Sequence, residues 1–453
     1  MKNTQNTNLT RRNILKFVAG SPAPIFIMGL FGGSALVGCK SESSSSENIA
    51  SVQYVKDAEE AAALVLNMAK MASDSGTFGV GGAIIENATG KVIKTMHNRV
   101  MQRLGENLGL LSGKPYTSDP TGHGERQLIS WYYENAASLS LPSPDKLTIV
   151  TSLDPCAMCA GSITTAGFNA AVAAYDTYAG INYNEKGNYP GLPPKIRNRL
   201  LDTFGFYGVS GGRAFIGADS TLYKDTLLSS STADGCFKVF EDSANKVRQT
   251  SSGSGLNPLN SVDQMIDPAL SPIRDIYASQ FPDAFSIKLK NYRRPDSALK
   301  SYLIKLKNST PNARNAVAFI DYYGNLLMAS ADRFDISPIS TALMLVVQNY
   351  SKIRFGLIND PVNTLSAQKS FTTPKYGTFV FLYAPSADET ATLKDMGVYG
   401  STMEGAIPVK SPSNFQYFQE PEFGTIKDLH RLIASMPPFY WELVNINPQK
   451  AII

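Results

Sequence analysis

The sequence predicts an α/β protein built from two successive domains. Between residues 58 and 175, segments with helical apolar spacing alternate with short segments rich in β-branched residues. A strand–turn–strand pattern followed by an apolar helical segment returns between residues 316 and 383. A stretch rich in Ser, Gly, Asn and Pro, residues 251–259, separates the two regions. We therefore expect a first domain over 56–250, a linker over 251–259 and a second domain over 260–453.

Residues 1–39 have the features of a targeting segment. The run from Thr10 to Lys16 contains Arg11-Arg12 and resembles the twin-arginine export motif. A weakly apolar stretch follows and ends in Leu36-Val37-Gly38-Cys39, which resembles a bacterial lipoprotein processing site with Cys39 as the lipidated residue. A short transmembrane anchor is the alternative, but prolines and glycines interrupt the stretch. We expect the protein to be exported by the twin-arginine route and anchored through its lipid at the cell envelope, on the periplasmic or outer face.

The charge balance depends on this segment. The whole chain has 42 basic and 38 acidic residues, a net charge of +4. Four of the basic residues and none of the acidic ones precede Cys39, so 42 − 4 leaves 38 basic against 38 acidic residues, a net charge of zero. A nucleic-acid-binding protein of this size should keep a basic surplus, so nucleic acid is not an expected partner. The next residues, 40–55, are rich in Ser and Glu and predict a flexible tether.

The elements of the first domain follow one another in a simple order. Apolar residues recur at helical spacing over 58–71, and a strand, a turn and a returning strand are predicted over 78–96. We then expect a helix that carries His123 and Glu125, a strand over 146–153, a helix that carries Cys156 and Cys159, and a strand over 170–175. Cys236 falls in a further predicted helix and is expected to be a buried thiol.

Two short motifs carry chemistry: His123-Gly124-Glu125 and Pro155-Cys156-Ala157-Met158-Cys159. One imidazole and two thiols supply three zinc ligands and leave the fourth tetrahedral position open for water. Glu125 follows the imidazole by two residues and can reach that water without being a ligand. A purely structural zinc site is the alternative, but it needs a fourth protein ligand, and neither other histidine has a motif that would supply one.

Each motif is expected to begin a helix. In both, an Asp followed by Pro (Asp119 and Asp154) precedes the ligands and predicts a helix N-cap. Cys156 and Cys159 are then three residues apart on one helix, so both sulfurs should lie on the same face.

The pattern His-x-Glu followed by Pro-Cys-x-x-Cys resembles that of the zinc-dependent cytidine and deoxycytidylate deaminase superfamily. The resemblance covers residues 56–178 and is closest to the branch of guanine deaminases and bacterial tRNA adenosine deaminases, which share Asp-Pro-Thr before the histidine and Pro-Cys-x-Met-Cys-Ala-Gly. It implies a cytidine-deaminase-like three-layer α/β/α fold with a mixed sheet.

The same resemblance implies a role for individual residues. His123, Cys156 and Cys159 would bind Zn²⁺, and Glu125 would be the catalytic proton shuttle while zinc-bound hydroxide attacks the ring and ammonia leaves. Asn98, after the second predicted strand, would bind the substrate; a turn-forming asparagine is the alternative reading of that position. Insertions over 102–118 and from 180 to about 225 depart from the family pattern and are expected near the pocket.

The second domain has the outline of the first without its metal motif. Aligned on the prolines, Thr341 stands at His123 and Leu343 at Glu125, while Ser386 and Glu389 stand at the two cysteines. We interpret it as a degenerate deaminase-like repeat; an unrelated α/β domain is the alternative. Either an internal pseudo-dimer or a homodimer is compatible with this organisation.

These observations give one leading hypothesis and two rivals. The leading one is an exported, lipid-anchored zinc hydrolase that deaminates a small-molecule base or nucleoside, with purines favoured, acting on carbon–nitrogen bonds of cyclic amidines. A non-catalytic surface lipoprotein that binds a ligand with an inherited zinc fold is the first rival. An effector-type deaminase that acts on a macromolecule is the second.

Overall fold

The computed structural model describes residues 53–184, 187–206, 228–250, 267–402, 404, 415–421 and 424–453. The targeting segment with Cys39, nearly all of the tether, and the linker over 251–259 lie outside the described residues, so what the sequence predicts for them stays a prediction. Within the described ranges, no helix combines the length and the apolar character needed to cross a membrane.

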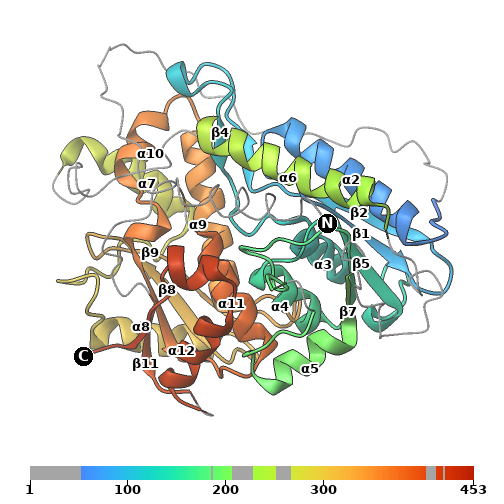
Figure 1. Ribbon diagram of the computed structural model, residues 1–453. Helices are drawn as coiled ribbons and strands as arrows, with labels where there is room; N and C mark the ends of the chain where they lie inside the picture. The colour runs from blue at the N-terminus through green and yellow to red at the C-terminus, as the bar shows by residue number, and fades with distance from the viewer. Residues whose placement is uncertain are drawn as a thin grey trace.

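The N-terminal half is an α/β unit coloured blue to green in Figure 1. Its helices are α2 Ala58–Ser75, α3 Gly124–Asn135, α4 Ala157–Ala166, α5 Pro194–Thr203 and α6 Ser230–Thr250. Its strands are β1 Gly81–Glu86, β2 Val92–His97, β3 Met101–Arg103, β4 Pro115–Thr117, β5 Leu147–Thr151, β6 Asn169–Val172 and β7 Phe204–Phe206.

The central sheet of this half is mixed and has helices on both faces. Its strand order is β2-β1-β5-β6-β7, with antiparallel pairing around β1 and parallel pairing from β5 to β7. Side chains alternate along β1: Ala83 and Ile85 pack toward α2, and Ile84 packs toward α3 and α4. Figure 1 shows α6 running alongside α2 on the outer face. The three-layer α/β/α fold expected from the sequence is confirmed.

The C-terminal half, yellow to red in Figure 1, contains a second α/β unit. Its helices are α7 Ser271–Gln280, α8 Ser297–Ser309, α9 Ala342–Ile358, α10 Thr364–Ser370, α11 Thr390–Ser401 and α12 Ile426–Ser435. Its strands are β8 Ala316–Ile320, β9 Leu326–Ala331, β10 Thr378–Tyr383, β11 Phe415–Gln419 and β12 Pro448–Lys450.

The second sheet repeats the topology of the first. Its order is β9-β8-β10-β11-β12, and the strands pair antiparallel around β8 and parallel from β10 to β12. Even the irregularity in the first hairpin returns, between Ile84 and Ile85 in one sheet and between Phe319 and Ile320 in the other. A shared strand order, shared strand directions and a shared bulge support the interpretation of the C-terminal half as a repeat.

The two halves meet through α4 and α11, which lie side by side at the centre of Figure 1. A Cβ at Gly161 would come within 2.4 Å of the backbone of Lys394, and one at Gly397 within 1.9 Å of the backbone of Met158. Only glycine permits so close a crossing of two helix backbones. The contacts are reciprocal, so they equate Gly161 with Gly397 and Met158 with Lys394 in an approximate two-fold arrangement.

This contact makes one continuous core from both halves. The apolar cluster around α4 contains Ile84 and Met158 of the first half together with Phe319, Phe379 and Met396 of the second. Two separately packed domains would each enclose a core of its own, whereas here the inner faces of both sheets share one.

The two insertions turn out to have structural roles. Residues 102–118 form most of the hairpin β3–β4 and pack on α9: the Gly105 N–H donates to Asn359 Oδ1 at 2.7 Å, and the Arg354 guanidinium lies over the Tyr116 ring. The segment after residue 180 includes α5 and β7, and β7 completes the first sheet. The sequence interpretation treated that segment wholly as an insertion and missed both the helix α5 and the strand β7, which is only three residues long. Cys236 is buried in α6, as expected.

Candidate metal centre

His123 and Cys156 occupy the N-caps of α3 and α4. The sequence interpretation assigned these caps to Asp119 and Asp154, and that was wrong because both carboxylates bind loop groups instead. Asp119 Oδ1 accepts the N–H and the hydroxyl of Thr121 at 2.9 and 2.6 Å, and Asp154 Oδ2 accepts an N–H from the loop after β6 at 2.8 Å. Each helix therefore begins at its metal-ligand residue, and the aspartates shape the turn that precedes it.

The turn before His123 is braced by a buried ion pair. Arg126 of α3 donates through Nη2 to Asp119 at 3.2 Å and through Nε to the Thr121 carbonyl at 2.7 Å. From the second half, the side-chain amide of Gln348 of α9 lies against Arg126, and with its oxygen assigned to this side it accepts a hydrogen bond from Arg126 Nη1 at 2.7 Å. Because α9 belongs to the C-terminal half, that half helps to fix the backbone that carries His123.

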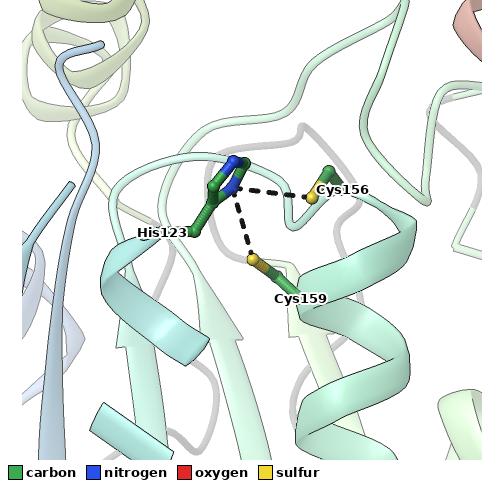
Figure 2. A group of neighbouring side chains, drawn as sticks. All are labelled: His123, Cys156 and Cys159. Carbon is green, nitrogen blue, oxygen red and sulfur yellow. Dashed lines mark hydrogen bonds between the residues drawn. The ribbon is translucent and has the colours of Figure 1, made fainter. Parts of the chain in front are cut away.

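Figure 2 shows His123, Cys156 and Cys159 pointing toward one another from the starts of α3 and α4. His123 Nδ1 lies 3.7 Å from Cys156 Sγ and 3.5 Å from Cys159 Sγ, and all three atoms lie within 4.8 Å of one another. Zinc bonds of about 2.0–2.1 Å to nitrogen and about 2.3 Å to sulfur place tetrahedral N and S ligands about 3.5 Å apart. The donor set and its spacing therefore fit Zn²⁺, and zinc is the cofactor of this site.

The environment of the site favours a thiolate. The pKa of Cys156 lies well below its ordinary value, chiefly because Cys159 donates a hydrogen bond to its sulfur and also because His123 lies beside it. The N-terminal end of α4 adds the partial positive charge of a helix start. A deprotonated sulfur is the form that binds a metal, so the lowered pKa of Cys156 favours metal binding at this site.

Glu125, in the first turn of α3, lies beside the ligand group without belonging to it. It is 2% exposed; Thr151 Oγ1 of β5 donates to Oε1 at 3.1 Å, and Cys159 Sγ lies 3.4 Å from Oε2. Burial raises the pKa of this carboxyl. Thr151 was not singled out from the sequence, because only the pairing of β5 with β1 places it opposite α3.

Asn98 directly follows β2 and reaches the same helix start. Its Oδ1 accepts the Gly124 N–H at 2.8 Å, one of the N–H groups that a helix start leaves without an intrahelical partner. The amide nitrogen of Asn98 remains as a donor. The neighbouring His97 places Nδ1 2.9 Å from the Asn98 carbonyl oxygen, an interaction within the chain.

The equivalent place in the second half holds a different set of side chains. Thr341 caps α9 as His123 caps α3, and Asp332 Oδ1 accepts the Ala342 N–H at 2.8 Å, as Asn98 does for Gly124. Thr341 Oγ1 donates to Asp395 Oδ1 at 2.7 Å, and the Lys394 ammonium lies 2.6 Å from the same oxygen. The reciprocal contact of α4 with α11 equates Asp395 with Cys159.

The sequence alignment of this half was therefore right for Thr341 and wrong for Ser386 and Glu389. Glu389 is the N-cap of α11 and Ser386 lies in the turn before it. The reciprocal contact of α4 with α11 equates Cys159 with Asp395, whereas the alignment on the prolines put Glu389 there, 395 − 389 or six residues too early. In place of an imidazole and two thiols, this half has a hydroxyl, a carboxylate and a buried ammonium.

Comparisons with known proteins agree with the geometry of the first half. Residues 55–175 match the family model described as the cytidine and deoxycytidylate deaminase zinc-binding region. No protein of curated function matches the chain.

Among solved structures, one from a study of tRNA:A34 deaminases has 22% identity over 26% of this chain and 78% of its own, with a TM-score of 0.20. A guanine deaminase from Nitrosomonas europaea has 13% identity over 43% and 89%, with a TM-score of 0.26. A structure in complex with 2,6-diaminopurine has 17% identity over 43% and 86%, with a TM-score of 0.27. Likenesses at this level say nothing about the substrate of this chain. The three side chains placed to hold a metal lie within the residues that match this zinc-binding region, so the ligand geometry agrees with the family-model match.

Proposed function

We propose that the protein is a hydrolytic deaminase of a small base or nucleoside, with purines as the favoured substrates. The observation that carries the proposal is Glu125: a buried carboxylate that borders the three ligands and stands outside the ligand group. A structural metal site has no use for such a group. Hydrolysis needs one, because a proton must leave water and another must reach the leaving nitrogen.

The parts of the reaction divide between the metal and the chain. Zn²⁺ held by His123, Cys156 and Cys159 would supply the nucleophile, because a metal of this kind makes hydroxide available from water at neutral pH. Thr151 holds one oxygen of Glu125, which fixes the carboxylate plane and leaves the other oxygen toward the ligands. Burial raises the pKa of Glu125, which favours uptake of a proton by the carboxyl during the reaction.

Asn98 is the residue we assign to substrate binding. Its carbonyl oxygen is engaged by Gly124, so the orientation of the amide is fixed and its NH₂ group is presented as a donor. A heterocyclic base offers ring nitrogens and carbonyl oxygens as acceptors for such a donor.

The substrate class rests on sequence and charge. The Asp-Pro-Thr and Pro-Cys-x-Met-Cys-Ala-Gly segments resemble those of deaminases that act on purines. The zero net charge of the chain beyond Cys39 favours a small molecule over a nucleic acid. Supporting evidence would be ammonia release by the purified mature protein from a panel of purine and pyrimidine bases and nucleosides.

Glu125→Gln tests the proposal, because glutamine keeps the size and hydrogen bonding of the side chain and cannot transfer protons. We expect zinc content to be retained and kcat to fall by a factor on the order of 10²–10⁴. Glu134→Gln, an exposed glutamate of the same helix, is the matched control and should change neither. His123→Ala should lose both metal and turnover.

Each outcome decides something. A Glu125→Gln protein without zinc would make Glu125 a ligand and end this assignment of roles. Full activity in that variant would require another proton shuttle. A wild-type protein that holds zinc and releases no ammonia from any compound of the panel would favour the ligand-binding alternative.

We also propose that the protein is exported by the twin-arginine route and anchored through a lipid on Cys39. The support is the order of the arginine pair, the apolar stretch and Leu-Val-Gly-Cys in the first 39 residues. Cys39→Ser should move the protein from the membrane fraction to the soluble fraction, while Ser45→Ala in the tether should not. Unchanged membrane fractionation of Cys39→Ser would contradict the anchor.

A further inference from the structure

The N-terminal end of α4, which carries Cys156, is contacted by a residue from the far end of the chain. The Ala157 N–H donates to the hydroxyl oxygen of Tyr440 at 3.0 Å. Tyr440 lies in the π-helical turn Phe439–Leu443 of the C-terminal half, 283 residues away in sequence, and is 1% exposed. A buried phenol usually finds a hydrogen-bond partner, and this one finds it at the helix start that holds a metal ligand.

The direction of this hydrogen bond leaves the phenol proton free for a second partner. The Tyr440 oxygen accepts from Ala157, so its own O–H must point to another acceptor. The Cys156 sulfur is the neighbouring acceptor, because Cys156 directly precedes Ala157 and its side chain lies within hydrogen-bonding reach of the Tyr440 hydroxyl. Cys156 makes no side-chain capping bond at the start of α4, and its sulfur can accept from Tyr440 in addition to Cys159.

Tyr440 is held in place by both halves. Its ring packs on Gly400 of α11, where a Cβ would come within 2.6 Å of the ring. Its neighbour Phe439 donates its N–H to the Tyr178 carbonyl of the first half at 3.2 Å and stacks edge-to-face on the Tyr178 ring. π-Helical turns are uncommon in proteins, and those that occur often lie at functional sites. This one places the Tyr440 hydroxyl against the helix that carries Cys156 and Cys159.

We propose that Tyr440 is a positioning residue of the zinc site: its hydroxyl bridges the Ala157 amide and the Cys156 sulfur and fixes that ligand for the metal. The C-terminal half, which has a hydroxyl and a carboxylate where the first half has its ligands, thereby supplies a group that the first site needs. Hydrogen bonds to a ligand atom commonly set both the orientation of the ligand and the affinity for the metal. The proposal concerns zinc binding and would stand even if the proposed deaminase reaction were wrong.

The experiment uses the full mature protein and the variant Tyr440→Phe, which removes the hydroxyl and keeps the ring. Zinc affinity is measured by competition with a chromophoric chelator, and the site is then loaded with Co²⁺ to record the sulfur-to-cobalt charge-transfer band. Tyr399→Phe is the matched control, because Tyr399 of α11 is equally buried and its hydroxyl has no hydrogen-bond partner within the described part of the chain.

We expect Tyr440→Phe to weaken zinc binding about 10–100-fold and to shift the charge-transfer band to longer wavelength, because the thiolate loses a hydrogen-bond donor. Tyr399→Phe should leave both readouts unchanged. A zinc affinity within twofold of the wild type with an unshifted band in Tyr440→Phe would overturn the proposal, whatever the effect on thermal stability. If Tyr440→Phe does not fold, Gly400→Ala, which displaces the ring and keeps the hydroxyl, should give the same band shift, and an unshifted band in that variant overturns the proposal as well.

Failure of this proposal and failure of the proposed function are distinguishable. An unchanged cobalt spectrum beside normal turnover removes Tyr440 and leaves the deaminase. A shifted spectrum in a protein that turns over no substrate keeps Tyr440 and removes the deaminase.

Discussion

The hydroxyl of Thr341 donates to a carboxylate oxygen of Asp395 at 2.7 Å, in the place where the first half sets His123 against Cys159. The ammonium of Lys394 contacts both Thr341 and Asp395. The second half thus sets the start of α9 against α11, as the first half sets the start of α3 against α4, and it holds a lysine ammonium there. This difference between the two halves leads to the first two predictions.

The mature protein should bind one zinc ion per chain. Among the described residues, His123, Cys156 and Cys159 are the group whose atoms are placed to hold a metal. Elemental analysis after purification without chelator should give a ratio of one. A ratio of two would mean that the second half binds metal, and a persistent ratio of zero would remove the cofactor assignment.

Replacement of Lys394 by methionine should destabilise the protein without adding a zinc site. Lys394 is fully buried against Asp395, so its loss leaves a buried carboxylate without its partner, at a cost of about 3–5 kcal/mol. The double variant Lys394→Met with Asp395→Asn removes both charges and should regain part of that loss. Thermal unfolding should show that Lys394→Met is less stable than the double variant. Equal stability of the two variants would show that loss of the ion pair does not cause the destabilisation.

Replacing Asn98 by aspartate or by alanine should separate its two roles, which are to accept the Gly124 N–H and to donate a hydrogen bond to the substrate. Asn98→Asp keeps an acceptor for the Gly124 N–H and loses the NH₂ donor, and Asp332 shows that a carboxylate can fill this position in the second half. We expect near-normal stability and a fall in kcat/KM of about 10–100-fold, the size of one hydrogen bond to substrate.

Asn98→Ala removes both groups and should in addition lower stability by about 1–3 kcal/mol, because a buried N–H loses its acceptor. Steady-state kinetics and denaturant unfolding of the two variants provide the test. Normal kcat/KM in Asn98→Asp would show that the residue is structural only.

Lys375 should make stability depend on pH in the alkaline range. Burial lowers its pKa to about 8, even though the adjacent Glu404 opposes this shift. Between about pH 8 and the ordinary lysine pKa, the unfolded chain therefore binds more protons than the folded chain, so stability rises with pH in this window. Relative to Lys375→Met, the wild type should gain up to about 1.4 kcal/mol per pH unit. A constant difference between the two proteins from pH 7.5 to about 9.5 would contradict the lowered pKa.

Much of the fold and of the site could be predicted because the signals are local. The apolar spacing of α2 and the β-branched run of β5 each lie within a few residues, and so do the ligand spacings in His123-Gly124-Glu125 and Cys156-Ala157-Met158-Cys159. Three-residue strands such as β7 carry too little pattern to be recognised. The helix caps were misjudged because local propensity favoured the aspartates, whereas Arg126 and the loop after β6 engage those carboxylates in the folded protein.

The sequence by itself predicted the metal, its three candidate ligands and the main order of strands and helices around them, because these depend on residue type and short spacing. Only the tertiary structure decided which groups surround them. Thr151 reaches Glu125 through the pairing of β5 with β1, and Asp395 replaces Cys159 through the crossing of α4 with α11. Tyr440 meets Ala157 through a contact that spans most of the chain. Contacts of this kind arise from the packing of distant segments into a shared core, and no spacing along the chain encodes them.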